Sequence, residues 1–206
     1  MSVLSREVPI DPAHAALLII DVQNYCARPE PGKTEYFRRS LRDTVLPNIR
    51  RLQTACRTGG IEVMYSVIEN MTRDGRDRSL DYKISGIDVL RGSWEACVLD
   101  EIAPAGDEMI FRKTSSSVFI STNIDYVLRN LGIRSLIVAG IMTDQCVESA
   151  VRDACDLGYL VTLVSNACTT NSAERHEQSL LAIRGYCRER ISEVVIGEIA
   201  AATGPG

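Results

Sequence analysis

Short apolar runs alternate along the chain with longer segments in which apolar residues recur every three or four positions. Several of these runs are nearly continuous in valine, isoleucine and leucine, which is typical of strands buried on both faces of a parallel sheet. The pattern predicts six strands, at Ala15–Val22, Ile61–Ile68, Glu108–Arg112, Ser135–Gly140, Leu160–Ser165 and Glu193–Ile196.

The segments between these strands have the periodicity of helices, which we expect at Tyr36–Thr58, Asn123–Leu131, Asp144–Leu157 and Ala173–Cys187. Pro47 is expected to kink or divide the first helix, and a glycine follows each of the first three. Alternating strands and helices predict an α/β fold: a doubly wound, mostly parallel six-stranded sheet with helices on both faces.

The 206 residues fit one domain, 1–206, because no linker, internal repeat or low-complexity run divides them. Residues 1–13 are expected to form an N-terminal extension, and 201–206 a frayed tail. One segment lacks periodicity: Asn70–Ser93 is rich in arginine, aspartate, glycine and serine, and predicts a long ordered loop.

Composition narrows the class of protein. The net charge is −4 and no basic stripe is visible, so nucleic acid is not an expected partner. No apolar run approaches the ~18 residues of a membrane span, and the first residues, MSVLSREVPIDPAH, lack the apolar core of a secretory signal. The seven cysteines are scattered without CxxC spacing, which argues against disulfides and structural zinc and predicts a cytoplasmic protein.

Candidate chemistry lies at the strand ends, because open α/β sheets collect function beyond the carboxyl ends of their strands. Asp21, Lys113 and Cys146 occupy three such positions. The chain has no glycine-rich dinucleotide fingerprint, no Walker A sequence and no G-x-S-x-G elbow. Its two histidines, His14 and His176, are expected at the surface, so neither a histidine-based triad nor a zinc centre is predicted.

Cys146 follows a predicted strand and a tight turn, in SLIVAGIMTDQCVESAVRDA. With Thr143 as N-cap, Cys146 is the third residue of the next helix. The unpaired N–H groups and the positive end of the helix dipole would lower the pKa of its thiol, as a nucleophile requires. The alternative is a small buried residue at a strand–helix junction.

Asp21 and Lys113 could supply the proton acceptor and the counter-charge that a thiolate needs. Separately, Asp21 could simply cap the following turn, and Lys113 could be a solvated lysine at a strand end. If the two residues meet, each stabilises the charge of the other, and the pair could hold the thiol of Cys146 as a thiolate.

Three segments match a known family in their order along the chain and in the strands that they follow. They are LLIIDVQN around Asp21, FRKTSSSVF around Lys113 and VAGIMTDQCVESAVRDA around Cys146. They resemble the isochorismatase-like cysteine hydrolase superfamily, which includes nicotinamidases, N-carbamoylsarcosine amidohydrolase, ureidoacrylate amidohydrolase and biuret hydrolase. The similarity extends from about Ala15 to Tyr186.

The resemblance implies a catalytic triad. Asp21 takes the thiol proton, Lys113 stabilises the charged pair and Cys146 attacks the carbonyl to give a thioester that water hydrolyses. It also implies a cis peptide bond between Ile141 and Met142, with the backbone N–H groups of Met142 and Cys146 as the oxyanion hole.

Departures from the family patterns narrow the range of reactions that we expect this chain to catalyse. The metal-binding histidines of nicotinamidases have no counterpart, because the chain has no histidine from Asp21 to Lys113; no metal and no cofactor are expected. True isochorismatases lack the cysteine, so Cys146 favours C–N bond hydrolysis. The expected partner is a small-molecule substrate, and family members are often homo-oligomers, which implies a dimer or tetramer.

Residues for substrate binding are proposed near these positions. Gln23 and Asn24 follow Asp21 and match a polar pair common in the family, and they are expected to orient either Asp21 or the substrate. Tyr25 and Trp94 could wall a pocket or pack in the core, and Glu69 could bind an N–H group or cap the loop. Arg73 could clamp a carboxylate, although aspartates interleave with the loop arginines, which favours a solvated, ion-paired loop.

The leading interpretation is a hydrolase that cleaves a small amide or ureido compound through a thioester, releasing ammonia or an amine. The alternatives are a metal-free nicotinamidase-type deamidase and a catalytically idle relative that serves as a binding or oligomeric scaffold. The intact Asp21, Lys113 and Cys146 argue against the scaffold. Cys26, which also follows the first strand, could be the nucleophile in place of Cys146, but it does not lie at the start of a helix.

Overall fold

Six parallel strands form one sheet in the order β3-β2-β1-β4-β5-β6. The structure, a computed structural model, describes residues 4–27 and 32–204. The arrangement confirms the predicted doubly wound α/β sheet. The strands are β1 (Ala15–Ile20), β2 (Glu62–Ile68), β3 (Met109–Lys113), β4 (Ser135–Ile141), β5 (Leu160–Thr169) and β6 (Arg188–Arg190).

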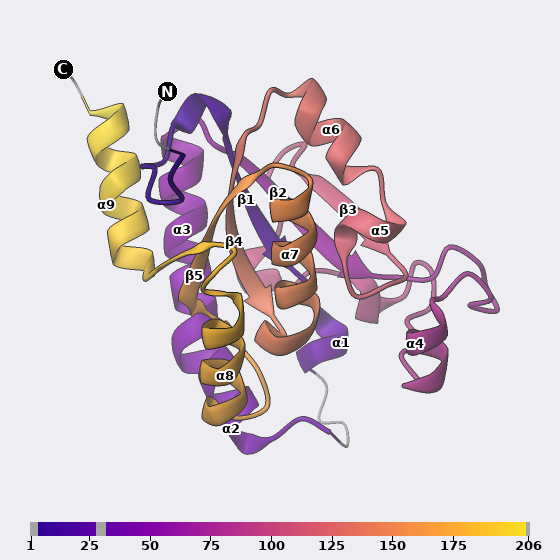
Figure 1. Cartoon of the computed structure of the whole chain (residues 1–206). Helices are drawn as coiled ribbons and strands as arrows, with labels where there is room; N and C mark the ends of the chain where they lie inside the picture. Colours follow the sequence, from indigo (N-terminus) through magenta and orange to yellow (C-terminus); the bar gives the residue numbers. More distant parts are fainter. Residues whose placement is uncertain (1–3, 28–31, 205–206) are drawn as a thin grey trace.

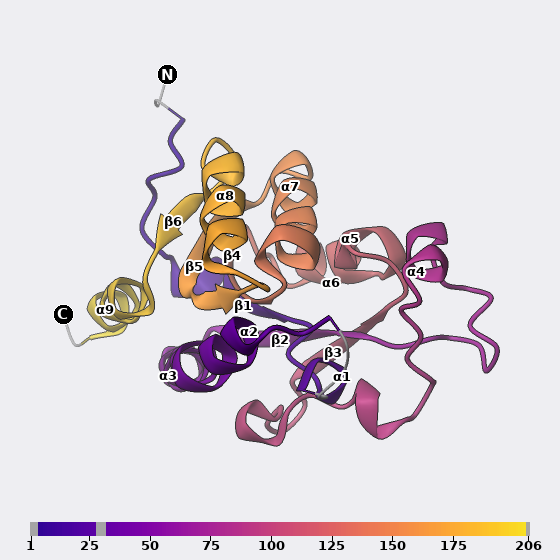
Figure 2. The same ribbon diagram turned by 90° about the horizontal axis from the view of Figure 1, so that it is seen from below.

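Helices cover both faces of the sheet (Figures 1 and 2). α3 (Leu46–Thr58) and α9 (Ser192–Thr203) pack on one face, and α6 (Ile124–Asn130), α7 (Glu148–Asp156) and α8 (Ala173–Ile183) pack on the other. Alternate residues of β1 point into the two layers, as the pleat of a strand requires. This central strand is therefore apolar on both faces, which explains the unbroken run AALLII.

Shorter elements connect these layers. They are the helices α1 (Asn24–Ala27), α2 (Glu35–Ser40), α4 (Leu80–Ile84) and α5 (Val118–Ser121), the π-helical turns η2 (Leu41–Val45) and η5 (Thr143–Val147), and the 3₁₀ turns η1 (Pro12–His14), η3 (Trp94–Ala96) and η4 (Asp100–Ile102).

The long helix predicted at Tyr36–Thr58 is divided just before Pro47, as expected for a proline inside a helix. The division is the π-helical turn η2, which joins α2 to α3. Pro47 lies in the first turn of α3, directly after η2, where a proline ring would clash with the carbonyl of Asp43 in a regular helix. Gly59 follows α3, as expected.

The prediction of a last strand at Glu193–Ile196 was wrong, because these residues lie in α9. Val195 and Ile199, one helical turn apart, are buried against the layer that includes α3. The sixth strand is instead the short segment Arg188–Arg190, whose polar sequence gives no apolar signal. Arg188 is buried there and pairs with Glu198.

The chain ends and the long loop contain more structure than predicted. The expected extension 1–13 includes the start of η1, and α9 runs into the expected frayed tail as far as Thr203. The final residues, 205–206, and the first three lie outside the described residues. Within Asn70–Ser93, α4 forms a helix, and Asp77 orders the loop by accepting hydrogen bonds from the N–H groups of Met71 and Thr72.

Candidate active site

Asp21 lies directly after β1, where the strand order reverses between β1 and β4. Its backbone has a φ of 55°, in the left-handed region that aspartate tolerates better than most residues. The side chain is buried, and its Oδ1 accepts a hydrogen bond of 2.8 Å from the hydroxyl of Ser66 on β2. The turn therefore directs the carboxylate into the protein at the sheet edge.

Gly140 on β4 allows this turn to form. It pairs with Ile20, the residue before Asp21. A Cβ atom at Gly140 would lie 2.2 Å from the carbonyl oxygen of Ile20, and the φ of Gly140 is +126°. Only glycine lets the two strands approach so closely beside the carboxylate.

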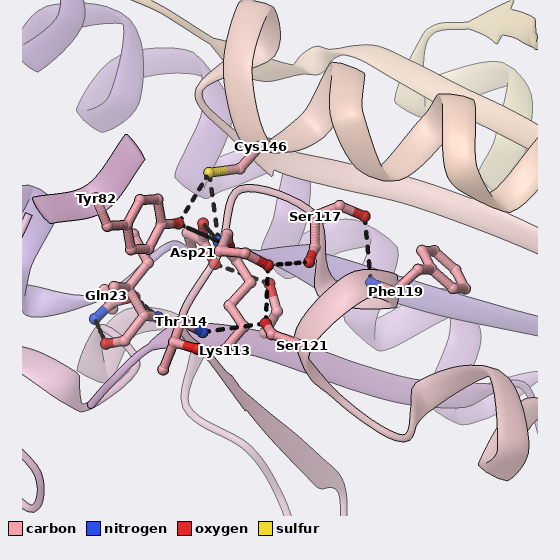
Figure 3. Close-up of polar contacts among 12 residues, drawn as sticks. Asp21, Gln23, Tyr82, Lys113, Thr114, Ser117, Phe119, Ser121 and Cys146 are labelled. Atoms are coloured by element: carbon pink, nitrogen blue, oxygen red, sulfur yellow. Dashed lines mark hydrogen bonds and ion pairs between the residues drawn. The ribbon is translucent and has the colours of Figure 1, made fainter. Parts of the chain in front are cut away.

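Lys113 ends β3 and extends across the end of β2 to Asp21. Its side chain is fully buried, and Nζ lies 2.8 Å from Oδ2 of Asp21 and 3.4 Å from Sγ of Cys146 (Figure 3). Burial alone would lower the pKa of Lys113, but Asp21 and Cys146 raise it above its ordinary value. The three predicted strand-end residues thus meet, with the lysine as an ammonium ion.

Cys146 lies in η5, the first turn after β4, and 7% of the residue is exposed. Two details differ from the prediction. The N-cap is Met142 rather than Thr143, which shares a hydrogen bond of 2.8 Å with His176. Burial, followed by the charge of Asp21, raises the pKa of the Cys146 thiol to about 12, against the opposing effect of Lys113.

The expected lowering of the thiol pKa by the helix start is therefore wrong, because desolvation outweighs the helix dipole in this buried site. The raised pKa favours the thiol form of the resting sulfur. Oδ2 of Asp21 is buried and receives no hydrogen bond of regular geometry from the residues that the structure describes. It therefore has a lone pair available for a proton from the neighbouring sulfur.

The peptide bond between Ile141 and Met142 is cis, as the resemblance implies. It joins the end of β4 to η5, so Met142 precedes the turn in which Cys146 lies. Their predicted role as oxyanion donors stays a prediction.

The sequence did not reveal two residues of the site, Tyr82 and Ser66. The hydroxyl of Tyr82, on α4, lies 2.8 Å from Nζ of Lys113 and 3.8 Å from Sγ of Cys146. Ser66 holds Asp21 from β2. A polar residue inside an apolar strand could have drawn attention to Ser66, but Tyr82 lies in a segment without periodicity.

Gln23 and Asn24 bind the protein backbone. Both N–H groups of the Gln23 amide donate to carbonyl oxygens, those of Ile68 and Glu95, and its oxygen accepts from the N–H of Ile68. Asn24 donates to the carbonyl of Trp94. Because both N–H groups of its amide are occupied, Gln23 fixes the turn after Asp21, which fits the expected role of orienting that acid; substrate binding by Gln23 and Asn24 stays a prediction.

Glu69 caps the loop, one of its two predicted roles. It accepts a hydrogen bond of 2.8 Å from the N–H of Gly92 and pairs with Arg112. Tyr25 is half-buried between two apolar clusters, which fits packing, whereas Trp94 is 61% exposed. Arg73 is exposed and has no ion-pair partner among the described residues. Its role in substrate binding remains a prediction.

Other predicted features have mixed outcomes. Both histidines are half-buried rather than fully at the surface, and burial lowers the pKa of His176. Cys26 is packed in the core layer beside α3, where burial raises its pKa to about 11.

In the described part of the chain, no three histidine, cysteine, aspartate or glutamate side chains cluster as metal ligands would. No helix there has both the length and the apolar character needed to cross a membrane.

Comparison with known proteins agrees with this geometry. A model of the isochorismatase domain matches residues 15–193. The chain belongs to the isochorismatase family. It is 30% identical over 190 residues to the ureidoacrylate amidohydrolase RutB of Agrobacterium fabrum, an alignment that covers 81% of this chain and 82% of the relative. RutB of Acinetobacter baylyi is 27% identical over 197 residues, covering 87% of this chain and 80% of the relative.

Solved structures of the isochorismatase family share the fold. A cysteine hydrolase from Pseudomonas syringae pv. phaseolicola superposes with a TM-score of 0.85 at 25% identity, covering 98% of this chain and 100% of the other. The N-carbamoylsarcosine amidase of Thermoplasma acidophilum has a TM-score of 0.72 at 22% identity, covering 87% and 96%, which is a likeness of fold alone. The chain is thus an isochorismatase-family hydrolase.

Proposed function

We propose that this hydrolase is a cysteine-dependent amidohydrolase that cleaves the C–N bond of a small amide or ureido compound. The observation that carries the proposal is the contact of one buried ammonium, Lys113 Nζ, with both the Asp21 carboxylate and the Cys146 sulfur. The similarity to ureidoacrylate amidohydrolases supports a C–N bond as the target.

The first half of the reaction forms a thioester. Asp21 takes the thiol proton of Cys146, and the thiolate attacks the carbonyl carbon of the substrate. The oxyanion that results accepts hydrogen bonds from the backbone N–H groups of Met142 and Cys146. The C–N bond then breaks, and Asp21 returns the proton to the departing ammonia or amine.

The second half hydrolyses the thioester. Asp21, again a carboxylate, takes a proton from water, and the hydroxide attacks the carbonyl carbon. The C–S bond breaks, and the sulfur recovers the proton from Asp21. Lys113 remains an ammonium throughout and stabilises whichever neighbour is anionic, because both lie within reach of its Nζ.

An ammonia-release screen tests this function. The panel contains ureido acids, biuret-like compounds, carbamoyl amino acids, simple amides and nicotinamide. We expect release from a ureido or carboxamide compound, and none from the Cys146→Ala variant. Cys97→Ala is the matched control, because it removes an exposed thiol and leaves the triad intact.

Two results would redirect the proposal. Release from nicotinamide alone would favour the nicotinamidase-type deamidase. No release from any compound, together with no preferential labelling of Cys146 by a substrate-like electrophile in intact-mass measurements, would favour the idle scaffold.

A further inference from the structure

The hydroxyl of Tyr82 lies beside both the ammonium of Lys113 and the sulfur of Cys146, and no step of the proposed reaction uses it (Figure 3). The residue is 1% exposed, although it belongs to the loop segment predicted as Asn70–Ser93. Besides contacting the triad, its hydroxyl donates a hydrogen bond of 2.8 Å to the carbonyl oxygen of Ser115. A phenol buried against a nucleophile calls for a role.

The hydrogens of Lys113 are all occupied in the resting site. An ammonium group has three N–H donors. Four acceptors compete for them: Oδ2 of Asp21, the Tyr82 hydroxyl and the Ser115 carbonyl, each at 2.8 Å, and the Cys146 sulfur at 3.4 Å. The sulfur is the most distant of the four acceptors, so a thiolate on Cys146 would be stabilised by a second donor besides Lys113.

The carbonyl of Ser115 receives two hydrogens in the same state. One comes from Tyr82 and the other from Lys113, each at 2.8 Å. A buried carbonyl needs only one donor to avoid the cost of an unsatisfied group. The hydroxyl hydrogen of Tyr82 can therefore leave Ser115 without leaving a buried acceptor unpaired.

We propose that Tyr82 is a positioning residue that turns its hydroxyl hydrogen from the Ser115 carbonyl to the Cys146 sulfur when the thiolate forms. The inference rests on the proposed function, in which the thiol proton passes to Asp21. The hydrogen moves by rotation about the bond between the ring and the oxygen, so the ring itself stays in place. A hydrogen bond to an ionised sulfur is stronger than one to a neutral carbonyl, which favours the switch.

The surroundings of Tyr82 suit a permanent donor. Burial, then the charges of Cys146 and Asp21, raises the pKa of the phenol, so the hydroxyl keeps its hydrogen. The start of α4 is fixed to the strand that bears Lys113, because the N–H of Ser79 donates to the carbonyl of Thr114 at 2.9 Å. Ser79 also caps the N–H of Tyr82.

The test is the rate at which iodoacetamide alkylates Cys146 in the Tyr82→Phe variant, measured by peptide mass from about pH 6 to about pH 10, the range in which thiols ionise. A Cys97→Ala background removes the exposed thiol as a competitor. We expect alkylation to slow about ten- to hundredfold at each pH, with a similar loss of kcat/KM, because the thiolate loses one charge-assisted donor.

Tyr65→Phe is the matched control. Tyr65 is equally buried, and its hydroxyl donates to Glu108 and accepts from Gln53, away from the sulfur. The control should alkylate like the unsubstituted protein, whatever its stability. Unchanged alkylation in folded Tyr82→Phe, or equal slowing in Tyr65→Phe, would overturn the role of Tyr82.

The result also separates this role from the proposed function. If the protein releases ammonia from no compound but Tyr82→Phe still slows alkylation, the positioning role stands and the hydrolase proposal fails. If Tyr82→Phe is insoluble, Tyr82→Met supplies the same measurement, because a flexible thioether side chain fills the space without a hydroxyl donor.

Discussion

Two clusters in this protein, one fully buried and one partly exposed, each combine a tyrosine hydroxyl, a cation and a carboxylate, and the buried one also holds a sulfur. The first is the triad site, defined by Asp21, Lys113 and Cys146, with Tyr82 beside it. The second, which we name the Tyr65 cluster, consists of Gln53, Arg57, Tyr65 and Glu108.

The Tyr65 cluster is saturated with hydrogen bonds. Arg57 donates to both oxygens of Glu108, at 2.7 and 2.9 Å, and the Tyr65 hydroxyl accepts from Gln53 and donates to Glu108. The side chain of Arg57 is also 35% exposed. The polar groups of this cluster are all paired with one another, so it serves stability.

The triad site is the opposite case. Lys113 is fully buried, and Oδ2 of Asp21 has an ion pair but no regular hydrogen bond among the described residues. A thiol lies beside that free acceptor. The difference teaches that a buried polar group left incompletely bonded next to a nucleophile is a stronger sign of chemistry than charge or burial alone.

The largest expected difference between the clusters is in how a substitution of the carboxylate changes the rate of ammonia release. Asp21→Asn should lower kcat/KM for ammonia release by about 10²–10⁴-fold, because an amide cannot take the thiol proton. The matched variant Glu108→Gln should leave the rate unchanged and cost about 1–2 kcal/mol of unfolding free energy, from a weakened hydrogen-bond network. Equal losses of rate in the two variants would contradict the comparison.

The next difference is in stability. Lys113→Met should lower the free energy of unfolding in urea by about 3–5 kcal/mol, because it leaves the Asp21 carboxylate buried without a partner. The double variant with Asp21→Asn should regain most of that loss.

Arg57→Met is the control for this cost. The pair of Arg57 with Glu108 is partly exposed, so its loss should cost only about 0.5–1 kcal/mol. If the two single variants were equally unstable, or if Asp21→Asn did not rescue Lys113→Met, an unpaired buried charge would not be the cause.

The smallest effect is a pH dependence of opposite sign in the two clusters. The folded pKa of Cys146 is about 12 and the ordinary value is 9.0, so its contribution to stability is present below pH 9.0 and is lost as the pH rises. From about pH 8 to about pH 10, under reducing conditions, Cys146→Ala should remove about 1 kcal/mol of this loss.

Glu108 should behave in the reverse way. Burial alone would raise its pKa, but Arg57 and backbone hydrogen bonds lower it below 4.5, so its contribution is present above pH 4.5 and is lost on acidification. Glu108→Gln should therefore flatten the acid limb of the stability curve, and Cys146→Ala the alkaline limb. An alkaline limb unchanged by Cys146→Ala would contradict the raised thiol pKa.

Much of the fold and part of the site could be predicted from the sequence. Five of the six strands gave apolar runs long enough to recognise, because strands buried on both faces need them. Asp21, Lys113 and Cys146 could be selected because each follows such a run, and the carboxyl ends of parallel strands share one edge. The short edge strand Arg188–Arg190 escaped notice because it has no apolar run.

Other features depend on contacts between distant segments. Nothing in the sequence around Tyr82 indicates that α4 places its hydroxyl against the sulfur, since α4 is fixed by hydrogen bonds to the exit of β3. The high pKa of Cys146 could not be predicted either. The start of a helix can be recognised in the local sequence, whereas desolvation depends on how distant segments pack around the thiol.

The sequence by itself determined the alternation of strands and helices and the edge of the sheet at which the acid, the lysine and the cysteine emerge. Hydrophobic periodicity is local, so the chain order records it. The tertiary structure alone decided which groups touch the sulfur and which hydrogen-bond acceptor stays free. Those depend on side chains from separate elements packing to within a few ångströms, and no single stretch of sequence encodes that distance.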